Sequence, residues 1–196
     1  MKQIEETQPH RNFVFSTEES FGYMNHNHVR DKDGVASLAL MAEIALWYKT
    51  KGMTLIDALD EIYEKFGYSK ETLLCLNYYG KEGAEKIGRI MDKFRSTIKE
   101  TFQERPIQSI EDYEKSEVYS LETKSSQKID FPISNVLCYN LASGDRICVR
   151  PSGTEPKIKF YIMVNENKGS LTEKKKSAET KTEETLAFIK KQAELA

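Results

Sequence analysis

The sequence predicts an α/β part followed by an α+β part, and three observations lead to this fold class. Early in the chain, a short apolar run typical of a strand precedes two segments with helical spacing of apolar residues. At residues 80–83 the composition shifts to glycine and charge, which indicates a domain boundary. Beyond it, two helical patterns flank closely spaced β-rich runs, as in a small antiparallel sheet packed against two helices. We therefore expect one domain over residues 1–80 and another over residues 81–196.

In the first part, the apolar run Asn12–Ser16 predicts a buried strand, and the polar loop Thr17–Tyr23 follows it. A helix is expected from Gly34 to about Thr50, because Asp33 suits its N-cap. Its apolar residues are numerous enough for burial on more than one side. A second helix begins at Thr54, which opens a T-x-x-D capping box. A strand is then expected over residues 72–78.

In the second part, a long helix is expected to run to about Phe102, before Arg105 and Pro106 stop it. Residues 107–134 are polar and poorly patterned, with strand potential only at residues 118–121. A Ser170-x-x-Glu173 capping box predicts the start of a final helix. The remaining β-rich runs predict three closely spaced strands, Val136–Leu141, Arg146–Arg150 and Lys157–Val164.

Composition excludes several classes of function. The chain has 196 residues, of which 39% are hydrophobic and 31% charged, and its net charge of -2 argues against a dedicated nucleic-acid binder. It holds no run of 18 apolar residues and no hydrophobic signal core, so we expect no membrane partner and a cytoplasmic location. Cys75, Cys138 and Cys148 lack C-x-x-C spacing and lie inside apolar runs, as buried thiols in a reducing compartment do.

The loop Arg150–Lys157 has the composition of an anion-binding loop. A guanidinium matches phosphate geometry, and the hydroxyls of Ser152 and Thr154 donate hydrogen bonds. Gly153 lets a ligand approach the backbone, and prolines at both ends reduce the entropy lost on binding. A polar hairpin loop explains the same residues, and chemistry alone leaves the two interpretations equal.

Three other groups of residues in the first part allow two interpretations each. Asp31–Gly34 resembles half of a calcium loop, but Ala42 stands where the twelfth-position acid would be. A helix N-terminus with Lys32 free to reach an anion is therefore favoured. His26 and His28 lack an obvious third metal ligand, so hydrogen-bonded or solvated histidines are favoured. One of Glu18 and Glu19, with Ser20 alongside, suits hydrogen bonds from sugar hydroxyls, and an ordinary exposed acidic loop explains the same residues.

Together these segments resemble the α-D-phosphohexomutases, the family of phosphoglucomutases and phosphomannomutases. Arg150–Lys159 resembles the phosphate-binding loop of that family's fourth domain, and Thr17–Gly22 resembles the sugar-binding loop of its third domain. Val29–Val35 resembles the segment after that sugar loop. The resemblance implies a partial third domain of mixed α/β/α type over residues 1–80 and the C-terminal domain over residues 81–196. Thr17 departs from the family's usual glycine, which affects the shape of the loop.

The resemblance also implies roles for individual residues. The substrate phosphate that is not being transferred would be held by Arg150, Ser152, Gly153, Thr154 and Lys159. Sugar hydroxyls would be bound by Glu18 and Ser20, with Lys32 near the substrate. The expected ligand is thus a phosphorylated sugar.

Two segments on which the family's reaction depends do not occur in these 196 residues. One carries the phosphoserine, in a Thr-Ala-Ser-His-Asn-Pro type sequence, and the other is the Asp-x-Asp-x-Asp-Arg loop that holds magnesium. We therefore expect no catalytic residue and no metal site in this chain, and no mutase activity from it alone. Its expected partners are the N-terminal mutase domains or a second copy of itself. The alternatives are a non-catalytic interaction module and part of a phosphopentomutase.

Overall fold

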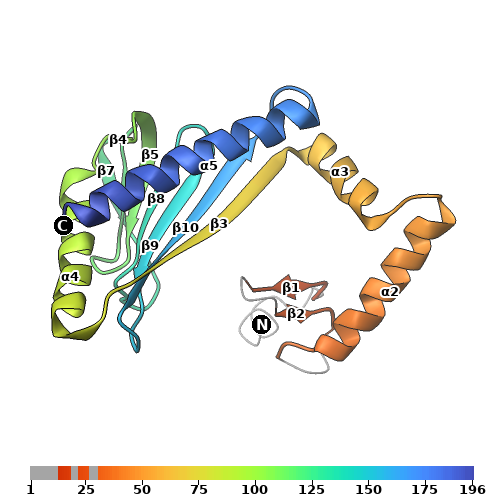
Figure 1. The fold of residues 1–196 in the computed structure, drawn as a ribbon, viewed down its shortest axis with the longest axis horizontal. Helices are drawn as coiled ribbons and strands as arrows, with labels where there is room; N and C mark the ends of the chain where they lie inside the picture. Colours follow the sequence, from red (N-terminus) through yellow and green to blue (C-terminus); the bar gives the residue numbers. More distant parts are fainter. Residues whose placement is uncertain (1–12, 19–21, 27–30) are drawn as a thin grey trace. The chain divides into compact units, whose positions relative to one another are not determined.

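The computed structural model of the protein describes residues 13–18, 22–26 and 31–196. The chain forms two compact units, unit 1 over Met1–Glu61 and unit 2 over Ile62–Ala196 (Figure 1). The α/β part followed by an antiparallel α+β part is the fold class that the sequence predicts.

Unit 1 contains a short hairpin and one long helix. Strands β1 (Ser16–Thr17) and β2 (Tyr23–Met24) pair in antiparallel register. The buried strand predicted at residues 12–16 is wrong for its described residues, because pairing begins only at Ser16 and the side chains of Val14 and Phe15 are 80% and 49% exposed. Their apolar character does not bury them, because no second layer covers them within the described part of unit 1.

Helix α2 (Gly34–Thr50) begins where the sequence predicts. The carboxylate of Asp33 accepts hydrogen bonds from the backbone amides of Val35 and Ala36, both at 3.0 Å, and so satisfies two of the donors left unpaired at a helix start. The burial expected on more than one side is wrong in this structure, since none of the helix's residues is fully buried.

Helix α3 (Leu55–Phe66) extends from unit 1 into unit 2. The predicted capping box at its start is confirmed: the amide of Thr54 donates to Asp57 at 2.7 Å, and the amide of Asp57 donates to Thr54 Oγ1 at 3.2 Å. Apolar residues at helical spacing, Leu55, Leu59, Ile62 and Phe66, predict a buried face. This prediction is wrong in the structure, because all four side chains are 40–70% exposed and only Ala58 of the helix is fully buried.

Unit 2 is built on an antiparallel sheet in the order β3-β10-β9-β8-β5-β6-β7, with β4 paired to β5. Strand β3 pairs with β10 along its whole length, so residues 68–77 belong to unit 2 by hydrogen bonding and not to a domain that ends at residue 80. The strand bounds are β3 Tyr68–Asn77, β4 Thr101–Phe102, β5 Arg105–Asp112, β6 Glu117–Ser120, β7 Ser125–Lys128, β8 Leu137–Leu141, β9 Arg146–Pro151 and β10 Lys157–Glu166.

Helices α4 (Gly80–Thr97) and α5 (Leu171–Glu194) cover one face of this sheet (Figure 1). Alternation along the strands decides which side chains meet the helices. In β10 the residues at even positions from 158 to 164 are fully buried, whereas those at odd positions from 157 to 163 are partly exposed on the other face. The core contains Phe160, whose ring centroid lies 5.3 Å from that of Phe94 on α4. The predicted capping box of α5 at Ser170 and Glu173 is confirmed.

The long helix of the second part is shorter than predicted. It ends at Thr97, and Phe102 lies in β4, although its side chain is fully buried as expected. Gln103 and Glu104 both have positive φ, 53° and 64°, and form the two-residue turn between β4 and β5. Neither residue is glycine or asparagine, so the sequence carried no signal for this hairpin.

The polar region 107–134 holds strands β6 and β7 and most of β5, although only residues 118–121 showed strand potential. Among the described residues, no helix is both long and apolar enough to span a bilayer.

Candidate sugar-phosphate-binding site

The loop Ser152–Pro156 connects β9 to β10 at one end of the sheet in unit 2. The amide of Ser152 donates to the carbonyl of Lys157 at 2.9 Å, which closes the base of the loop. Within it, Ser152 Oγ accepts from the amides of Thr154 at 3.5 Å and Glu155 at 3.3 Å. The hydroxyl oxygen is thereby fixed by the backbone, and its hydrogen remains available to an external acceptor.

Arg150 and Lys159 lie directly opposite each other on β9 and β10, next to this loop. Like charges at directly opposite positions of an antiparallel pair destabilise it. The guanidinium of Arg150 is exposed and makes no hydrogen bond or ion pair with any described residue. Glu155, whose pKa Lys159 helps to lower, is ion-paired with Lys157, so three cations share one carboxylate and leave a local excess of positive charge. A bound anion would relieve this repulsion.

Neighbouring contacts hold the loop in place. The amide of Tyr78, just after β3, donates to the carbonyl of Pro156 at 2.8 Å. Lys157 and Glu155 form an ion pair, and the hydrogen bond between them lowers the pKa of the Glu155 carboxyl and raises the pKa of Lys157. A Cβ added at Gly153 would meet no atom within 4 Å, so the backbone there is open to a ligand. The five predicted phosphate-binding residues therefore lie together in one part of unit 2.

In unit 1, Glu18 and Lys32 are brought together by the β1–β2 hairpin. Lys32 Nζ lies 3.4 Å from Glu18 Oε1 and 3.5 Å from Asp31 Oδ1. These two carboxylates, Glu18 foremost, raise the pKa of Lys32. A Cβ at Gly22 would lie 2.3 Å from Glu18 Oε1 and 2.4 Å from Lys32 Cδ, so a larger residue there would force these two side chains to shift. Ser20, the third predicted sugar-binding residue, lies outside the described residues.

A small cavity of about 230 Å³ accompanies this pair, lined by residues of the hairpin and of the turn before α2. Glu18, Gly22 and Lys32 are among its walls. Asp33 does not face a ligand here, because it caps α2 and its other oxygen lies 3.1 Å from His26 Nε2. Hydrogen bonds from the helix start, that of the Ala36 amide foremost, lower the pKa of Asp33.

The residues do not fit the magnesium ion that the family resemblance implies for the complete enzyme. Among residues 13–18, 22–26 and 31–196, no three histidine, cysteine or acidic side chains gather as metal ligands. The carboxylate of Asp33 caps the helix and contacts His26. The carboxylate of Asp31 accepts a hydrogen bond from the backbone amide of Lys32 at 2.7 Å. His10 and His28 lie outside the described residues.

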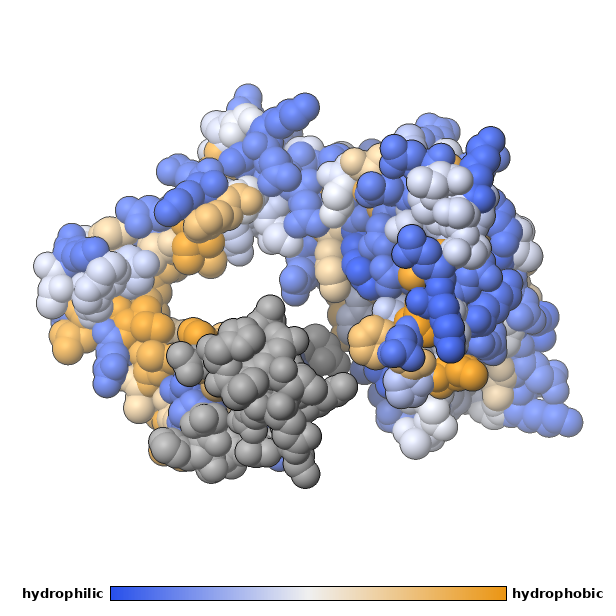
Figure 2. Space-filling model, turned by 180° about the vertical axis from the view of Figure 1, so that it is seen from behind, coloured by the Kyte–Doolittle hydropathy of each residue, from blue (hydrophilic) through white to orange (hydrophobic). Residues whose placement is uncertain are grey.

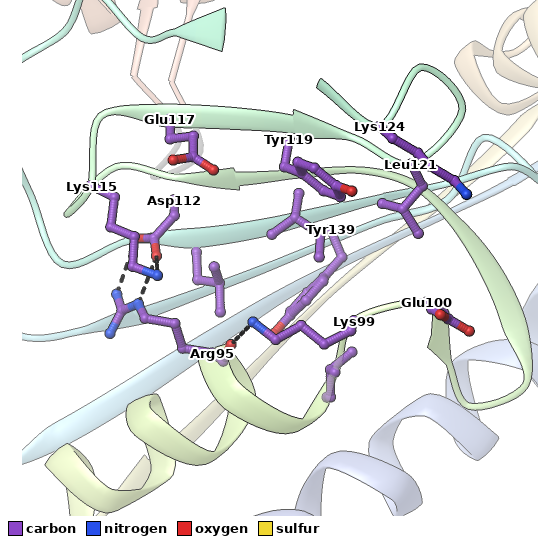
Figure 3. A pocket seen from close by; sticks show the side chains of 13 residues that line it. Arg95, Lys99, Glu100, Asp112, Lys115, Glu117, Tyr119, Leu121, Lys124 and Tyr139 are labelled. Carbon is purple, nitrogen blue, oxygen red and sulfur yellow. Dashed lines mark hydrogen bonds and ion pairs between the residues drawn. The ribbon is translucent and has the colours of Figure 1, made fainter. Parts of the chain in front are cut away.

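A second cavity in unit 2, of about 550 Å³, was not predicted from the sequence (Figure 3). It lies between the end of α4 and strands β5 and β6, and none of the phosphate-loop residues lines it. Three of the four cations in its lining have partners: Arg95 Nε donates to Asp112 at 2.9 Å, Lys115 lies 3.8 Å from the same carboxylate, and Lys99 donates to a carbonyl of α4. Among the described residues only Lys124 of these four has no partner, and the lining also holds the carboxylates Glu100 and Glu117. It therefore offers less unsatisfied charge to an anion than Arg150 and Lys159 do.

Comparison with known proteins agrees with the resemblance expected from the loops. Residues 1–66 match the family domain described as "Phosphoglucomutase/phosphomannomutase, alpha/beta/alpha domain III". A phosphoglucomutase of Staphylococcus aureus (strain bovine RF122 / ET3-1) is 42% identical over 161 residues, which are 82% of this chain and 29% of that protein. The phosphoglucomutase of strain USA300 is 41% identical with the same coverage. The chain thus spans 29% of the length of these relatives.

A solved structure has the same fold. The open form of pp63/parafusin, a phosphoglucomutase from Paramecium, superimposes with a TM-score of 0.53, covering 91% of this chain and 30% of that one at 19% identity. The similarity in sequence confirms the family that the three segments indicate, and the solved structure shows the same fold.

Proposed function

We propose that this chain, which belongs to the phosphoglucomutase/phosphomannomutase family, binds a phosphorylated sugar as the C-terminal portion of such an enzyme. One observation carries the proposal: Arg150 is exposed, has no partner among the described residues, and lies directly opposite Lys159 beside a hydroxyl-bearing loop. This arrangement costs stability in the free chain and is relieved by an anion.

Unit 2 supplies the phosphate-binding part of this function. Arg150 offers a planar pair of donors to two phosphate oxygens, and Lys159 adds a second charge. Ser152 and Thr154 donate their hydroxyls, while Gly153 leaves the backbone open. Together these groups would hold the phosphate that stays on the sugar during the family's reaction.

Unit 1 supplies the sugar-binding part. Glu18 would accept hydrogen bonds from sugar hydroxyls, with Ser20 beside it. Lys32, held at 3.4 Å from Glu18, would donate to the same ligand. Glu18 and Lys32 line a cavity of about 230 Å³. This volume is large enough for part of a monosaccharide and too small for a larger ligand.

The chain alone would position a substrate without transferring phosphate. Phosphoryl transfer needs a nucleophile and stabilisation of the charge on the moving group, which magnesium provides in the complete enzyme. The phosphoserine and triple-aspartate segments do not occur in these 196 residues. We therefore propose that activity requires N-terminal mutase domains as a partner. A phosphomannomutase or phosphopentomutase would use this portion in the same way. The cytoplasmic location stays a prediction.

Calorimetric titration with glucose 1-phosphate tests this function. Arg150→Ala should weaken binding by about 2 kcal/mol, roughly thirty-fold in Kd, the scale of a lost charge-assisted contact. The control is Lys190→Ala, an exposed cation on α5, which should leave Kd unchanged. Equal affinities for the wild type and Arg150→Ala would show that Arg150 does not bind the phosphate. Turnover of glucose 1-phosphate by the chain with no partner would contradict the proposed lack of activity.

A second candidate function, a non-catalytic interaction module, is favoured by the surface of α2 and α3. Figure 2 shows hydrophobic side chains gathered over this part of the chain. The most exposed on α2 are Val35, Leu38 and Leu46, at 83%, 73% and 63%. Contiguous exposed apolar surface favours association with a partner or with a second copy.

The only tryptophan of the chain reports on this surface, because Trp47 lies on α2 and is 52% exposed. If the surface mediates self-association, its fluorescence emission should shift to the blue as protein concentration rises. Leu38→Lys should abolish the shift. Light scattering that gives a monomer mass at all concentrations would rule out self-association.

A further inference from the structure

Two cysteines lie directly opposite each other on the helix-free side of the sheet in unit 2. Cys138 on β8 and Cys148 on β9 are register partners in an antiparallel pair. Directly opposite residues in such pairs have Cα atoms about 4.5–5.5 Å apart. Disulfides span Cα separations of about 4.4–6.8 Å, so the spacing of such a pair lies within the range that a disulfide can bridge. Both are free thiols, Cys138 buried and Cys148 partly exposed.

A fixed guanidinium lies next to one of these sulfurs. Arg146 Nε donates to Cys148 Sγ at 3.3 Å, and Nη2 of the same side chain donates to Glu111 Oε2 at 2.9 Å. Glu111 is held in turn by Asn140, whose Nδ2 donates to Oε1 at 2.8 Å. Three strands therefore position one cation against the sulfur of Cys148. Cationic donors of this kind favour the thiolate form of cysteine.

The two thiols are unequal because of these contacts. A hydrogen bond from the Cys138 thiol, supported by Arg146, holds the pKa of Cys148 below its ordinary value, although burial opposes this. The same hydrogen bond and burial raise the pKa of Cys138. Cys148 is thus the nucleophilic sulfur, and Cys138 is the buried neighbour that supplies the second thiol.

We propose that Cys148 and Cys138 form an oxidisable dithiol, in which Cys148 reacts with a small peroxide and Cys138 then closes a disulfide between β8 and β9. In the first step the Cys148 thiolate attacks one peroxide oxygen. An S–O bond forms, the O–O bond breaks, and the departing alkoxide or hydroxide takes a proton from water. In the second step Cys138 sulfur attacks Cys148 sulfur, so that an S–S bond forms and the S–O bond breaks. Hydroxide leaves and combines with the Cys138 proton as water.

The products balance these steps. The two thiols lose two protons and two electrons, and the peroxide is reduced to an alcohol or water plus a second water. The site is independent of the sugar-phosphate proposal, although Cys148 precedes Arg150 by two residues on the same face of β9. Oxidation would therefore covalently fix the strand that leads into the phosphate loop.

Mass spectrometry on the full 196-residue chain tests the proposal, with hydrogen peroxide as the oxidant. Cys75 provides an internal reference thiol, because it is exposed on β3 and the burial predicted for it is wrong. Trypsin cleaves after Arg146 and so separates the two cysteines, which makes a disulfide visible as a cross-linked peptide pair. We expect Cys148 to react several-fold faster than Cys75, and the cross-link to form and to disappear again with dithiothreitol. Reaction at Cys75 first, or overoxidation of Cys148 without a cross-link, would overturn the proposal.

Variants separate the roles of the two thiols and of the guanidinium. Cys138→Ser should stop the reaction at the sulfenic acid of Cys148, trapped as a dimedone adduct, and Cys138→Ala serves if the serine variant does not fold. Arg146→Gln should slow the oxidation of Cys148 several-fold. Arg89→Gln, an exposed arginine on α4, is the matched control and should leave the rate unchanged. Equal rates for Arg146→Gln and the wild type would show that the guanidinium does not activate the thiol.

Discussion

The two units differ in how far their apolar side chains are buried. In unit 2, a sheet and two helices enclose a core in which Phe160, Phe94 and Ile189 are completely buried. In unit 1, helix α2 is richer in apolar residues than α4 or α5, yet none of its residues is fully buried. Burial therefore depends on a second layer that faces the apolar residues, and apolar content alone does not provide it.

The largest expected effect is on the core of unit 2. Phe160→Ala should lower the free energy of unfolding by about 3–5 kcal/mol, because it removes a fully buried aromatic side chain and leaves a cavity. Leu38→Ala on α2 should change it by less than about 0.5 kcal/mol, since this side chain is 73% exposed. Urea unfolding followed by circular dichroism measures both. Similar losses for the two variants would mean that α2 is covered in solution.

A second prediction concerns a buried charge in unit 2. Asp145 is 1% exposed and accepts hydrogen bonds from Arg105 at 3.0 Å, Ser143 at 2.8 Å and the amide of Asn165 at 2.9 Å. Asp145→Ala should destabilise the protein by about 3 kcal/mol, because it leaves a partly buried guanidinium unpaired. Glu155→Ala, which breaks the exposed pair with Lys157, is the control and should have little effect. Thermal unfolding that ranks the two variants in the opposite order would refute this assignment.

Helix caps allow a finer comparison of the units. In unit 2, Ser170→Ala removes the hydroxyl of a complete capping box and should cost about 1 kcal/mol, measured by urea unfolding. Thr172→Ala is the control, because it removes an exposed hydroxyl of α5 that makes no hydrogen bond with a described residue. No loss relative to that control would mean that packing alone sets the start of α5.

The cap of α2 in unit 1 should depend on pH. The pKa of Asp33 is lowered in the folded chain, so the stabilisation by its carboxylate is present above the unfolded pKa of about 3.9 and is lost as pH falls through the lower, folded value. Helical signal should therefore decrease on acidification below about pH 4. Asp33→Asn keeps a capping oxygen and should remove that part of the pH dependence. If the wild type and Asp33→Asn lose helical signal at the same pH, another group and not Asp33 causes the acid transition.

Local signals in the sequence were sufficient for the features that depend on neighbouring residues. Asp33, Thr54 and Ser170 cap helices as predicted, since a cap needs only the side chain and the backbone a few residues away. The alternation of side chains along residues 157–164 correctly predicted that one face of this strand is buried. The assignment of the loop after Arg150 to phosphate binding also rests on local chemistry, and it stays a prediction.

Features that depend on distant residues were decided by the tertiary structure. The pairing of β3 with β10 joins residues far apart in the chain, and it places residues 68–77 in unit 2. The β4–β5 turn uses positive φ at two residues that do not favour it, because burial of Phe102 compensates the local cost. The opposition of Arg150 to Lys159, and of Cys138 to Cys148, is set by strand register. Sequence alone determined which groups are present, and the sheet decided which of them meet, because register brings together side chains that no local pattern relates.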